Sequence, residues 1–383
     1  MKNTTLNQRP YPPFRYDIVG SFLRPQALRE ARRKFAAADI SQAELTRVEE
    51  EEIAKLVARQ KAVGLKAVTD GEFRRSYWHL DFFWGFQGVE HVLMEHGYFF
   101  HGEETRKDSA RLSQKIRFDG THPFLLHYQF LKGIAPEGVV AKQCIPAPAQ
   151  LYAELVRGIN EKEVDRLYPD REELYRDIGR AYHDVILAFY GLGCRNIQLD
   201  DCTWGMLCDP DFLRIIGISE DGLQAIQALY LRLNNDAIAD LPQDLVVTTH
   251  VCRGNYHSTW AGSGGYEPVA EVLLGQENVS AYFLEYDTDR AGDFAPLRHL
   301  PDNKVVVLGL VSSRTGELED KALIIDRIRQ AAQYVPLDRL CLSPQCGFAS
   351  TEEGNILAEE QQWVKLAFVR EIAEEVWNEG GLA

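Results

Sequence analysis

The chain has 383 residues, of which 45% are hydrophobic and 26% charged, and its formal net charge is −15. This composition is typical of a soluble globular protein and excludes disordered, collagen-like and low-complexity classes. An acidic excess of this size repels phosphate backbones, so we expect no nucleic-acid partner. The sequence holds no apolar run near the roughly 20 residues that a membrane helix needs, and residues 1–13 are too polar for a secretory signal. We therefore expect a cytoplasmic protein.

The chain carries seven cysteines, an odd number and a low density. In a reducing compartment such cysteines are buried thiols, metal ligands or nucleophiles rather than a disulfide framework. They are Cys144, Cys194, Cys202, Cys208, Cys252, Cys341 and Cys346.

Short, mostly apolar runs alternate with helical segments along the chain, and we interpret eight of these runs as strands. They cover residues 17–21, 67–72, 139–145, 196–201, 245–252, 280–287, 304–311 and 339–345. Apolar residues at three-to-four spacing predict helices over 41–64, 172–190, 222–239, 318–334 and 356–379. Ser41 and Glu44 form a capping box at the start of the first of these helices. The alternation predicts an α/β fold, a (β/α)8 TIM barrel that forms one domain over residues 1–383, rather than a doubly wound sheet.

Two stretches depart from this alternation. Residues 22–40 form an N-terminal excursion, and residues 73–138 are too long for one crossover helix between the second and third strands. We expect 73–138 to be an insertion of a hairpin and loops over the barrel mouth. It holds six of the ten histidines, at positions 79, 91, 96, 101, 122 and 127. Their spacing does not match a metal site, so we expect packing or solvated roles for them.

Barrel enzymes carry their chemistry at the carboxyl ends of the strands. The polar residues at these ends are Ser21, Asp70, Glu72, Cys144, Asp200, Asp201, His250, Cys252, Glu285, Asp287, Ser312, Ser313, Gln345 and Cys346. Soft metal ligands and carboxylates dominate this set. The set contains no Ser-His-Asp triad and no lysine placed for a Schiff base.

His250 and Cys252 stand two positions apart at one strand end, so alternation directs both side chains to the same face. With Cys346, in the sequence SPQCGF, they form a soft nitrogen and sulfur set of the kind that Zn²⁺ prefers. Glu285, at the end of an intervening strand, can add an oxygen ligand. We expect Cys194 and Cys341 to be packing residues, and the spacing of Cys202 and Cys208 does not match a zinc site.

Six short motifs, in this order, resemble the catalytic domain of cobalamin-independent methionine synthases, and in particular its short single-domain relatives. They are VGS at 19–21, DGE at 70–72, QLDD at 198–201, HVC at 250–252, FLEYD at 283–287 and PQCGF at 344–348. The resemblance extends from about residue 15 to the C-terminal helix. It implies a zinc-dependent methyltransferase that transfers a methyl group to the thiol of homocysteine and so forms methionine.

The resemblance also implies residue roles. The family's zinc ligands correspond to His250, Cys252, Glu285 and Cys346, the set already favoured by the strand ends. Its amino-acid substrate is bound by residues that match Ser21, Glu72 and Asp200. Carboxylates suit the ammonium group of homocysteine, and Zn²⁺ converts a thiol of pKa ~8.5 into the nucleophilic thiolate.

The methyl donor is less well defined. Ser312, Ser313 and Arg314 occupy the segment where the folate-using enzymes carry an Asp and a His that handle a proton. The donor stays open between a methyltetrahydrofolate-type molecule, a methylcorrinoid, free or on a partner protein, and another small donor. Trp204, Asp201 and Trp78 are candidates for donor binding.

Three other classes stay open at this stage. One is a zinc hydrolase or lyase acting on a small thiol or carboxylate substrate, although hydrolytic zinc usually has His and carboxylate ligands. The second is a related barrel that decarboxylates a porphyrin or moves a methyl group to a corrinoid partner. The third is a zinc protein without catalytic activity.

Overall fold

In the computed structural model, residues 11–377 are described, so the expectation for residues 1–10 of the N-terminus lies outside them. Six parallel strands form the central sheet, in the order β12–β11–β10–β9–β8–β7. They are β7 (Gln143–Pro146), β8 (Asn196–Asp201), β9 (Val246–Val251), β10 (Ala281–Glu285), β11 (Val305–Val311) and β12 (Leu340–Pro344). Nearly every residue of these strands is buried, as expected where helices cover a parallel sheet.

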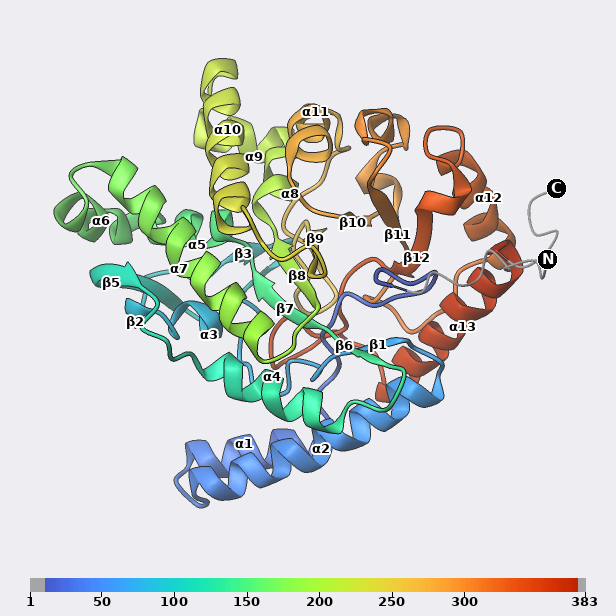
Figure 1. Ribbon diagram of the computed structural model, residues 1–383, viewed down its shortest axis with the longest axis horizontal. Helices are drawn as coiled ribbons and strands as arrows, with labels where there is room; N and C mark the ends of the chain where they lie inside the picture. The colour runs from blue at the N-terminus through green and yellow to red at the C-terminus, as the bar shows by residue number, and fades with distance from the viewer. Residues whose placement is uncertain (1–10, 378–383) are drawn as a thin grey trace.

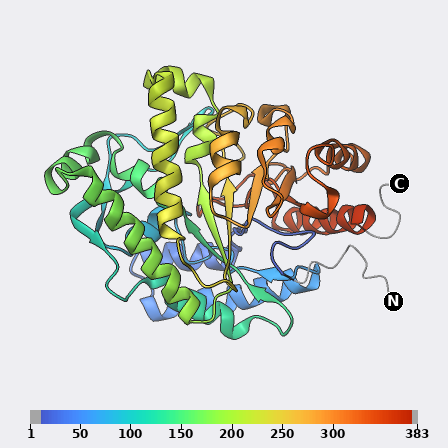
Figure 2. The ribbon, with the colours of Figure 1, turned by 45° about the horizontal axis from the view of Figure 1, so that its top comes forward.

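Helices surround this sheet, and Figures 1 and 2 show them on the outside of the strands, with the N-terminal pair along one side. They are α1 (Gln26–Ala36), α2 (Gln42–Ala62), α3 (Leu80–Phe83), α4 (Pro123–Ile134), α5 (Pro148–Leu155), α6 (Glu161–Leu167), α7 (Arg171–Gly191), α8 (Thr203–Leu207), α9 (Pro210–Ile216), α10 (Glu220–Ala237), α11 (Glu267–Gln276), α12 (Lys321–Ala331) and α13 (Glu359–Trp377). Short 3-10 turns lie at η1 (Gly158–Asn160), η2 (Asp289–Ala291), η3 (Ala295–His299) and η4 (Leu337–Arg339). The predicted helices correspond to α2, α7, α10, α12 and α13.

The capping box of α2 is confirmed. The Ser41 hydroxyl accepts a hydrogen bond from the Glu44 backbone N–H at 3.3 Å, and the Glu44 carboxylate accepts one from the Ser41 N–H at 2.8 Å. Because the first N–H groups of a helix have no partner within the helix, this reciprocal pair fixes where α2 begins.

Two predicted strands are much shorter than expected. The second is reduced to β1 (Ala67–Val68), which pairs in parallel with β6 (Val140–Ala141) in a separate two-stranded sheet. The predicted strand at 17–21 was wrong: the ladder there is limited to a bridge between Tyr16 and Leu342. The Asp17 carboxylate accepts hydrogen bonds from the N–H groups of Phe14 and Ile18, so these amides do not pair with a strand.

Gly20 shows why the chain turns away after that bridge. Its φ is +155°, and a Cβ at this position would lie 2.6 Å from the Cys144 sulfur. A glycine is therefore required where this segment passes close to β7. Among the described residues the ladders do not form a closed ring of eight strands, so the α/β alternation and the parallel sheet are confirmed and the closed TIM barrel is not.

The insertion contains the predicted hairpin and a second, smaller one. Strands β2 (Gln87–Leu93) and β5 (Asp108–Arg117) pair antiparallel, and the short strands β3 (Phe99–Phe100) and β4 (Glu103–Glu104) form a smaller hairpin between them. Helix α4 then crosses back to β6, so the part of 73–138 that adds to the regular alternation ends near residue 118.

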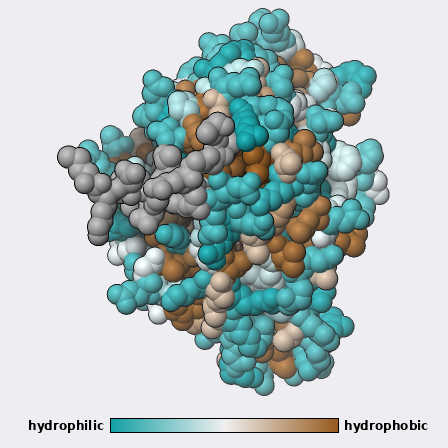
Figure 3. Space-filling model, turned by 90° about the vertical axis from the view of Figure 1, so that its right-hand side faces the viewer, coloured by the Kyte–Doolittle hydropathy of each residue, from teal (hydrophilic) through white to brown (hydrophobic). Residues whose placement is uncertain are grey.

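The surface is mainly polar on the side that carries α12 and α13, with scattered apolar residues (Figure 3). Exposed apolar side chains such as Leu323 and Val364 stand singly there, which is ordinary for a globular protein. In the described part of the chain, no helix combines the length and the apolar character that a bilayer span needs.

Candidate metal centre and ligand cavity

His250 is the penultimate residue of β9, and its ring is held in one orientation. Its Nδ1 lies 3.1 Å from the carbonyl oxygen of Phe283 on the neighbouring strand β10. A carbonyl only accepts, so Nδ1 carries the proton and Nε2 has a free lone pair. Nε2 is buried and has no hydrogen-bond partner among the described residues. A buried lone pair of this kind is suited to bind a metal ion.

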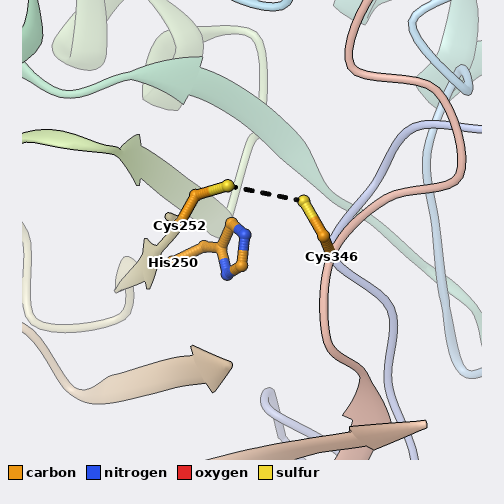
Figure 4. Close-up of side chains that lie close together, drawn as sticks. All are labelled: His250, Cys252 and Cys346. Atoms are coloured by element: carbon orange, nitrogen blue, oxygen red, sulfur yellow. Dashed lines mark hydrogen bonds between the residues drawn. The ribbon is translucent and has the colours of Figure 1, made fainter. Parts of the chain in front are cut away.

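Cys252 and Cys346 place their sulfurs next to this ring (Figure 4). The N–H of Cys252 donates to the Asp201 carbonyl at 3.0 Å, so the residue continues the edge of β9. Cys346 lies in the loop after β12. The two sulfurs are 3.7 Å apart, and the ligand atoms of His250, Cys252 and Cys346 all lie within 4.8 Å of one another.

This trio fits a zinc ion by its chemistry and by its spacing. Two thiolate sulfurs that share a tetrahedral zinc at about 2.3 Å lie about 3.8 Å apart, close to the 3.7 Å between Cys252 and Cys346. One imidazole nitrogen and two thiolates form a soft donor set that favours zinc over magnesium or calcium. The trio leaves one coordination position for a further ligand.

The electrostatics of the cluster favour one thiolate. Hydrogen bonds from the thiols of Cys202 and Cys346 hold the pKa of Cys252 well below its usual value. The same hydrogen bonds, together with burial, raise the pKa of Cys202 and Cys346. Burial alone would lower the pKa of His250, but the negative charges of Cys252, Asp200 and Glu285 near the ring outweigh burial and raise it.

Glu285, the fourth predicted ligand, lies beside this trio rather than within it. It ends β10, is fully buried, and places Oε1 3.5 Å from the Cys252 sulfur. Its carboxylate also faces two guanidinium groups, those of Arg290 at 3.3 Å and Arg314 at 3.4 Å. Burial raises the pKa of Glu285, and these arginines oppose that shift.

The trio opens into a cavity of about 310 Å³ that also contains the three predicted substrate residues. Ser21, Glu72 and Asp200 all line it, together with His250, Cys252 and Cys346. Residues far apart in the sequence therefore meet in one cavity, as the strand-end argument predicted. The described residues that line this cavity include no lysine and no arginine.

The two carboxylates of the cavity are deeply buried. Burial raises the pKa of Glu72 to about 7 and that of Asp200 to about 6. Arg75 lies 3.3 Å from Glu72 Oε1, whereas Glu72 Oε2 has no hydrogen-bond partner among the described residues. The negative charge of Asp200 also contributes to the raised pKa of Glu72. The two carboxylates together therefore favour a bound counterion. A cationic group between them would satisfy both.

Ser21 reaches the cavity because Gly347, which lies against it in the fold, has no side chain. A Cβ on Gly347 would lie 1.9 Å from the Ser21 hydroxyl oxygen. That hydroxyl also accepts a hydrogen bond from the N–H of Ala349 at 3.3 Å. The PQCGF motif thus positions both the Cys346 sulfur and the Ser21 hydroxyl.

The three predicted donor residues separate into two groups. Trp78 lines the cavity and stacks on His79, with ring centroids 4.5 Å apart. Asp201 and Trp204 are fully buried and are not among the lining residues. The Asp201 carboxylate accepts hydrogen bonds from Thr203 and Asn234, and Trp204 packs edge-on against Tyr230.

The sequence argument missed several residues of the cavity wall. Phe99 and Phe100 of the small hairpin, and Phe212 of α9, contribute aromatic rings. His79, which was expected to have a packing or solvated role, lines the cavity as well. Cys202, whose spacing had argued against a role, hydrogen-bonds the Cys252 sulfur. Spacing along the chain does not show such contacts, since they depend on the turn after β8.

The fold and the site together define an α/β protein with a candidate His/Cys metal centre at the carboxyl ends of parallel strands. Comparison with known proteins gives the family. Residues 15–88 match the profile of the cobalamin-independent synthase catalytic domain. The uncharacterised protein YxjH of Bacillus subtilis is 46% identical over 367 residues, which are 96% of this chain and 95% of that protein.

Solved structures agree with this assignment. A protein from Listeria monocytogenes, described as a candidate vitamin-B12 independent methionine synthase, is 40% identical with a TM-score of 0.76, over 96% of this chain and 99% of that one. A B12-independent methionine synthase from Shewanella sp. W3-18-1, in complex with selenomethionine, is 18% identical and shares the fold, with a TM-score of 0.70 over 94% and 97% of the two chains. The chain belongs to the cobalamin-independent methionine synthase family, a family of methyltransferases.

Proposed function

We propose that this protein is a zinc-dependent methyltransferase that transfers a methyl group from a methyltetrahydrofolate-type donor to the thiol of homocysteine, forming methionine. One observation carries the proposal: a His/Cys/Cys set with zinc-compatible spacing shares a cavity of about 310 Å³ with two buried, under-compensated carboxylates. The first feature suits a thiol and the second an ammonium group. Homocysteine carries both.

His250, Cys252 and Cys346 would hold the zinc ion, with Glu285 as the fourth ligand in the absence of substrate. The bound ion supplies the positive charge that keeps the substrate sulfur deprotonated and nucleophilic at neutral pH. Two thiolate ligands limit the Lewis acidity of the ion, so the substrate sulfur stays reactive. Arg290 and Arg314 pair with the Glu285 carboxylate and would balance its charge whether or not it bound the ion.

Glu72 and Asp200 would bind the homocysteine ammonium group, and the Ser21 hydroxyl would contact its carboxylate. Burial of all three side chains excludes water from the polar end of the substrate, which strengthens each charge-assisted hydrogen bond. The sulfur is thereby directed at the metal trio. The methyl group then approaches from the aromatic side of the cavity, where Trp78 and Phe100 lie.

The donor assignment follows the family. Its description as cobalamin-independent gives no support to a methylcorrinoid or a corrinoid partner protein. We do not propose a hydrolase or lyase, because two thiolates are an unusual ligand set for hydrolytic zinc. We propose that Asp201 and Trp204 support the donor side of the cavity from behind and do not contact the donor.

The proposal extends to architecture and compartment. We infer that segment 15–22 and β1 complete an eight-stranded barrel with the six-stranded sheet, in which β6 and β7 are two parts of one strand. Supporting contacts are the backbone hydrogen bonds Asp17 N–H to Leu342 O at 3.0 Å and Phe22 N–H to Gly71 O at 3.1 Å. Val19 also packs inside with residues of β10, β11 and β12. Seven free cysteines suit a reducing compartment such as the cytoplasm.

The experiment combines metal content with methyl transfer. Purified protein should contain about one zinc per chain. Methionine formation is then measured with 5-methyltetrahydrofolate before and after chelation and zinc restoration. Zinc-free protein that forms methionine at the full rate would overturn the proposal.

A further inference from the structure

Three described residues on the cavity wall each have a buried polar side-chain atom without a hydrogen-bond partner. These atoms are His250 Nε2, Glu72 Oε2 and His79 Nδ1. Burying such an atom unpaired is costly, so a ligand is expected to satisfy it. In the proposed function the metal takes the first and the substrate ammonium group the second. The third atom, on His79, has no partner in that scheme.

The protonation pattern of His79 follows from its neighbours. Its Nε2 lies 2.9 Å from the Tyr98 hydroxyl oxygen, and Tyr98 donates its only proton to Glu154 Oε2 at 2.5 Å. Tyr98 therefore accepts from His79, and the ring proton resides on Nε2. Nδ1 is left as an unpaired lone-pair acceptor on a residue that lines the cavity. The ring is held in place by stacking on Trp78 and by edge contact with Phe83, at 5.7 Å between centroids.

Glu154 closes this chain of hydrogen bonds inside the protein. Arg157 binds both of its oxygens, at 2.9 and 3.1 Å, and the Ser109 hydroxyl and the Ala110 N–H donate to Oε1. The side chain of Glu154 is almost fully buried. Burial, aided by the charge of Arg157, lowers the pKa of His79 to about 3, so the ring passes a proton on rather than storing it as a cation.

We propose that His79 is the acid–base residue of the methyl transfer, and that Tyr98 and Glu154 form the relay through which it takes up and returns a proton. This inference rests on the proposed function. In a catalytic triad a carboxylate fixes the tautomer of a histidine. Glu154 does the same for His79, with the Tyr98 hydroxyl between them.

The proton balance of the methyl transfer defines what the relay must do. When the homocysteine thiol binds as thiolate, its proton passes to Nδ1, the Nε2 proton passes to Tyr98, and the Tyr98 proton passes to Glu154. The sulfur electron pair then forms the S–CH₃ bond as the C–N bond of the donor breaks and its pair stays on nitrogen. The relay runs in reverse and protonates that nitrogen, so the overall reaction neither gains nor loses a proton.

Two other candidates for this role are already engaged. The Tyr77 hydroxyl donates to Asp108 at 2.7 Å. The segment 312–314 is engaged elsewhere: the Ser313 hydroxyl donates to the Gly347 carbonyl at 2.8 Å, and Arg314 pairs with Asp287 at 2.8 Å. An amine leaving group needs a proton, so a group outside that segment must supply it.

The test compares two methyl donors in the zinc-loaded full chain. With 5-methyltetrahydrofolate the departing nitrogen needs a proton, whereas with methyl iodide the departing iodide does not. His79→Asn keeps an acceptor near the position of Nδ1 but cannot pass a proton. We expect it to lower kcat with the folate donor about 100-fold, with KM for homocysteine nearly constant, and to lower the ratio of folate rate to iodide rate at least about 30-fold. Tyr98→Phe should change the ratio in the same direction and remove the solvent hydrogen isotope effect.

His96→Asn, at an exposed histidine of the same insertion, is the matched control and should leave the ratio unchanged. Equal losses with both donors, or no loss with the folate, would overturn the role of His79 while leaving the metal proposal intact. If the wild-type protein did not transfer the methyl group of methyl iodide to homocysteine, the result would instead contradict the proposed function. Independently of any donor, the ¹⁵N spectrum of histidine-labelled protein should show His79 protonated on Nε2, and protonation on Nδ1 would refute the relay.

Discussion

The cavity has two walls of different origin. On one wall His250 lies in β9, while Cys252 and Cys346 follow β9 and β12, and the ladders of these strands fix their positions. On the other wall Trp78, His79 and the small hairpin come from the insertion, which contacts the sheet through side chains and loops. On the proposed function, the sheet would supply the fixed metal chemistry, whereas the insertion would supply the surface that contacts the methyl donor.

The largest effect should come from the sheet wall. Cys252→Ser removes the sulfur that contacts Cys346, Cys202 and Glu285, so zinc content should fall from about one ion per chain to below about a tenth. Methionine formation should fall at least about 1,000-fold. Metal analysis and a methyl-transfer assay measure both. Cys208→Ala, at a buried cysteine outside the metal trio, is the control and should keep its zinc. Full zinc occupancy in Cys252→Ser would contradict the proposed ligand set.

The second prediction separates substrate binding from metal binding on that same wall. Because the pKa of Glu72 is raised to about 7, its carboxylate is charged at pH 8 and largely protonated at pH 5.5. Glu72→Gln should therefore raise KM for homocysteine about 30-fold at pH 8, but less than about 3-fold at pH 5.5. Zinc content should not change. Steady-state kinetics across this pH range check it, and a pH-independent ratio would mean that Glu72 does not bind the ammonium group.

A third prediction concerns the insertion wall. Phe100 lines the cavity and packs against Tyr256 with centroids 5.3 Å apart. Phe100→Ala should raise KM for the methyl donor about 5-fold through lost apolar contact, while KM for homocysteine stays within about 2-fold. Leu93→Ala, at an exposed position of β2, serves as the control. An increase confined to homocysteine would reverse the assignment of the two walls.

The smallest effect is expected where the insertion meets the sheet loops at the surface. His257 lies 3.0 Å from Glu103, and both side chains are exposed. Exposed pairs contribute little because water and salt screen them, so Glu103→Gln should change donor KM less than about 2-fold. A larger change in the same assay would show that the hairpin depends on this contact for its position.

The same contrast explains what the sequence could predict. The metal trio could be predicted because strand alternation places His250 and Cys252 on one face, and because parallel strands end at one edge. The segment 17–21 was misjudged because Asp17 satisfies nearby amides with its side chain, an alternative that β-branched composition does not reveal. The relay was not predictable, since His79, Tyr98 and Glu154 come from three segments whose approach depends on how the insertion folds over the sheet.

The absence of lysine and arginine among the described residues that line the cavity has a consequence for the far end of the donor. A folate carries its carboxylates at the end remote from the methyl group, and nothing in the described lining offers them a cation. Left in water, those charges would be screened and contribute little to binding. The enzyme should therefore be nearly indifferent to how many glutamates the donor bears, and would accept donors that differ only in that solvent-exposed extension.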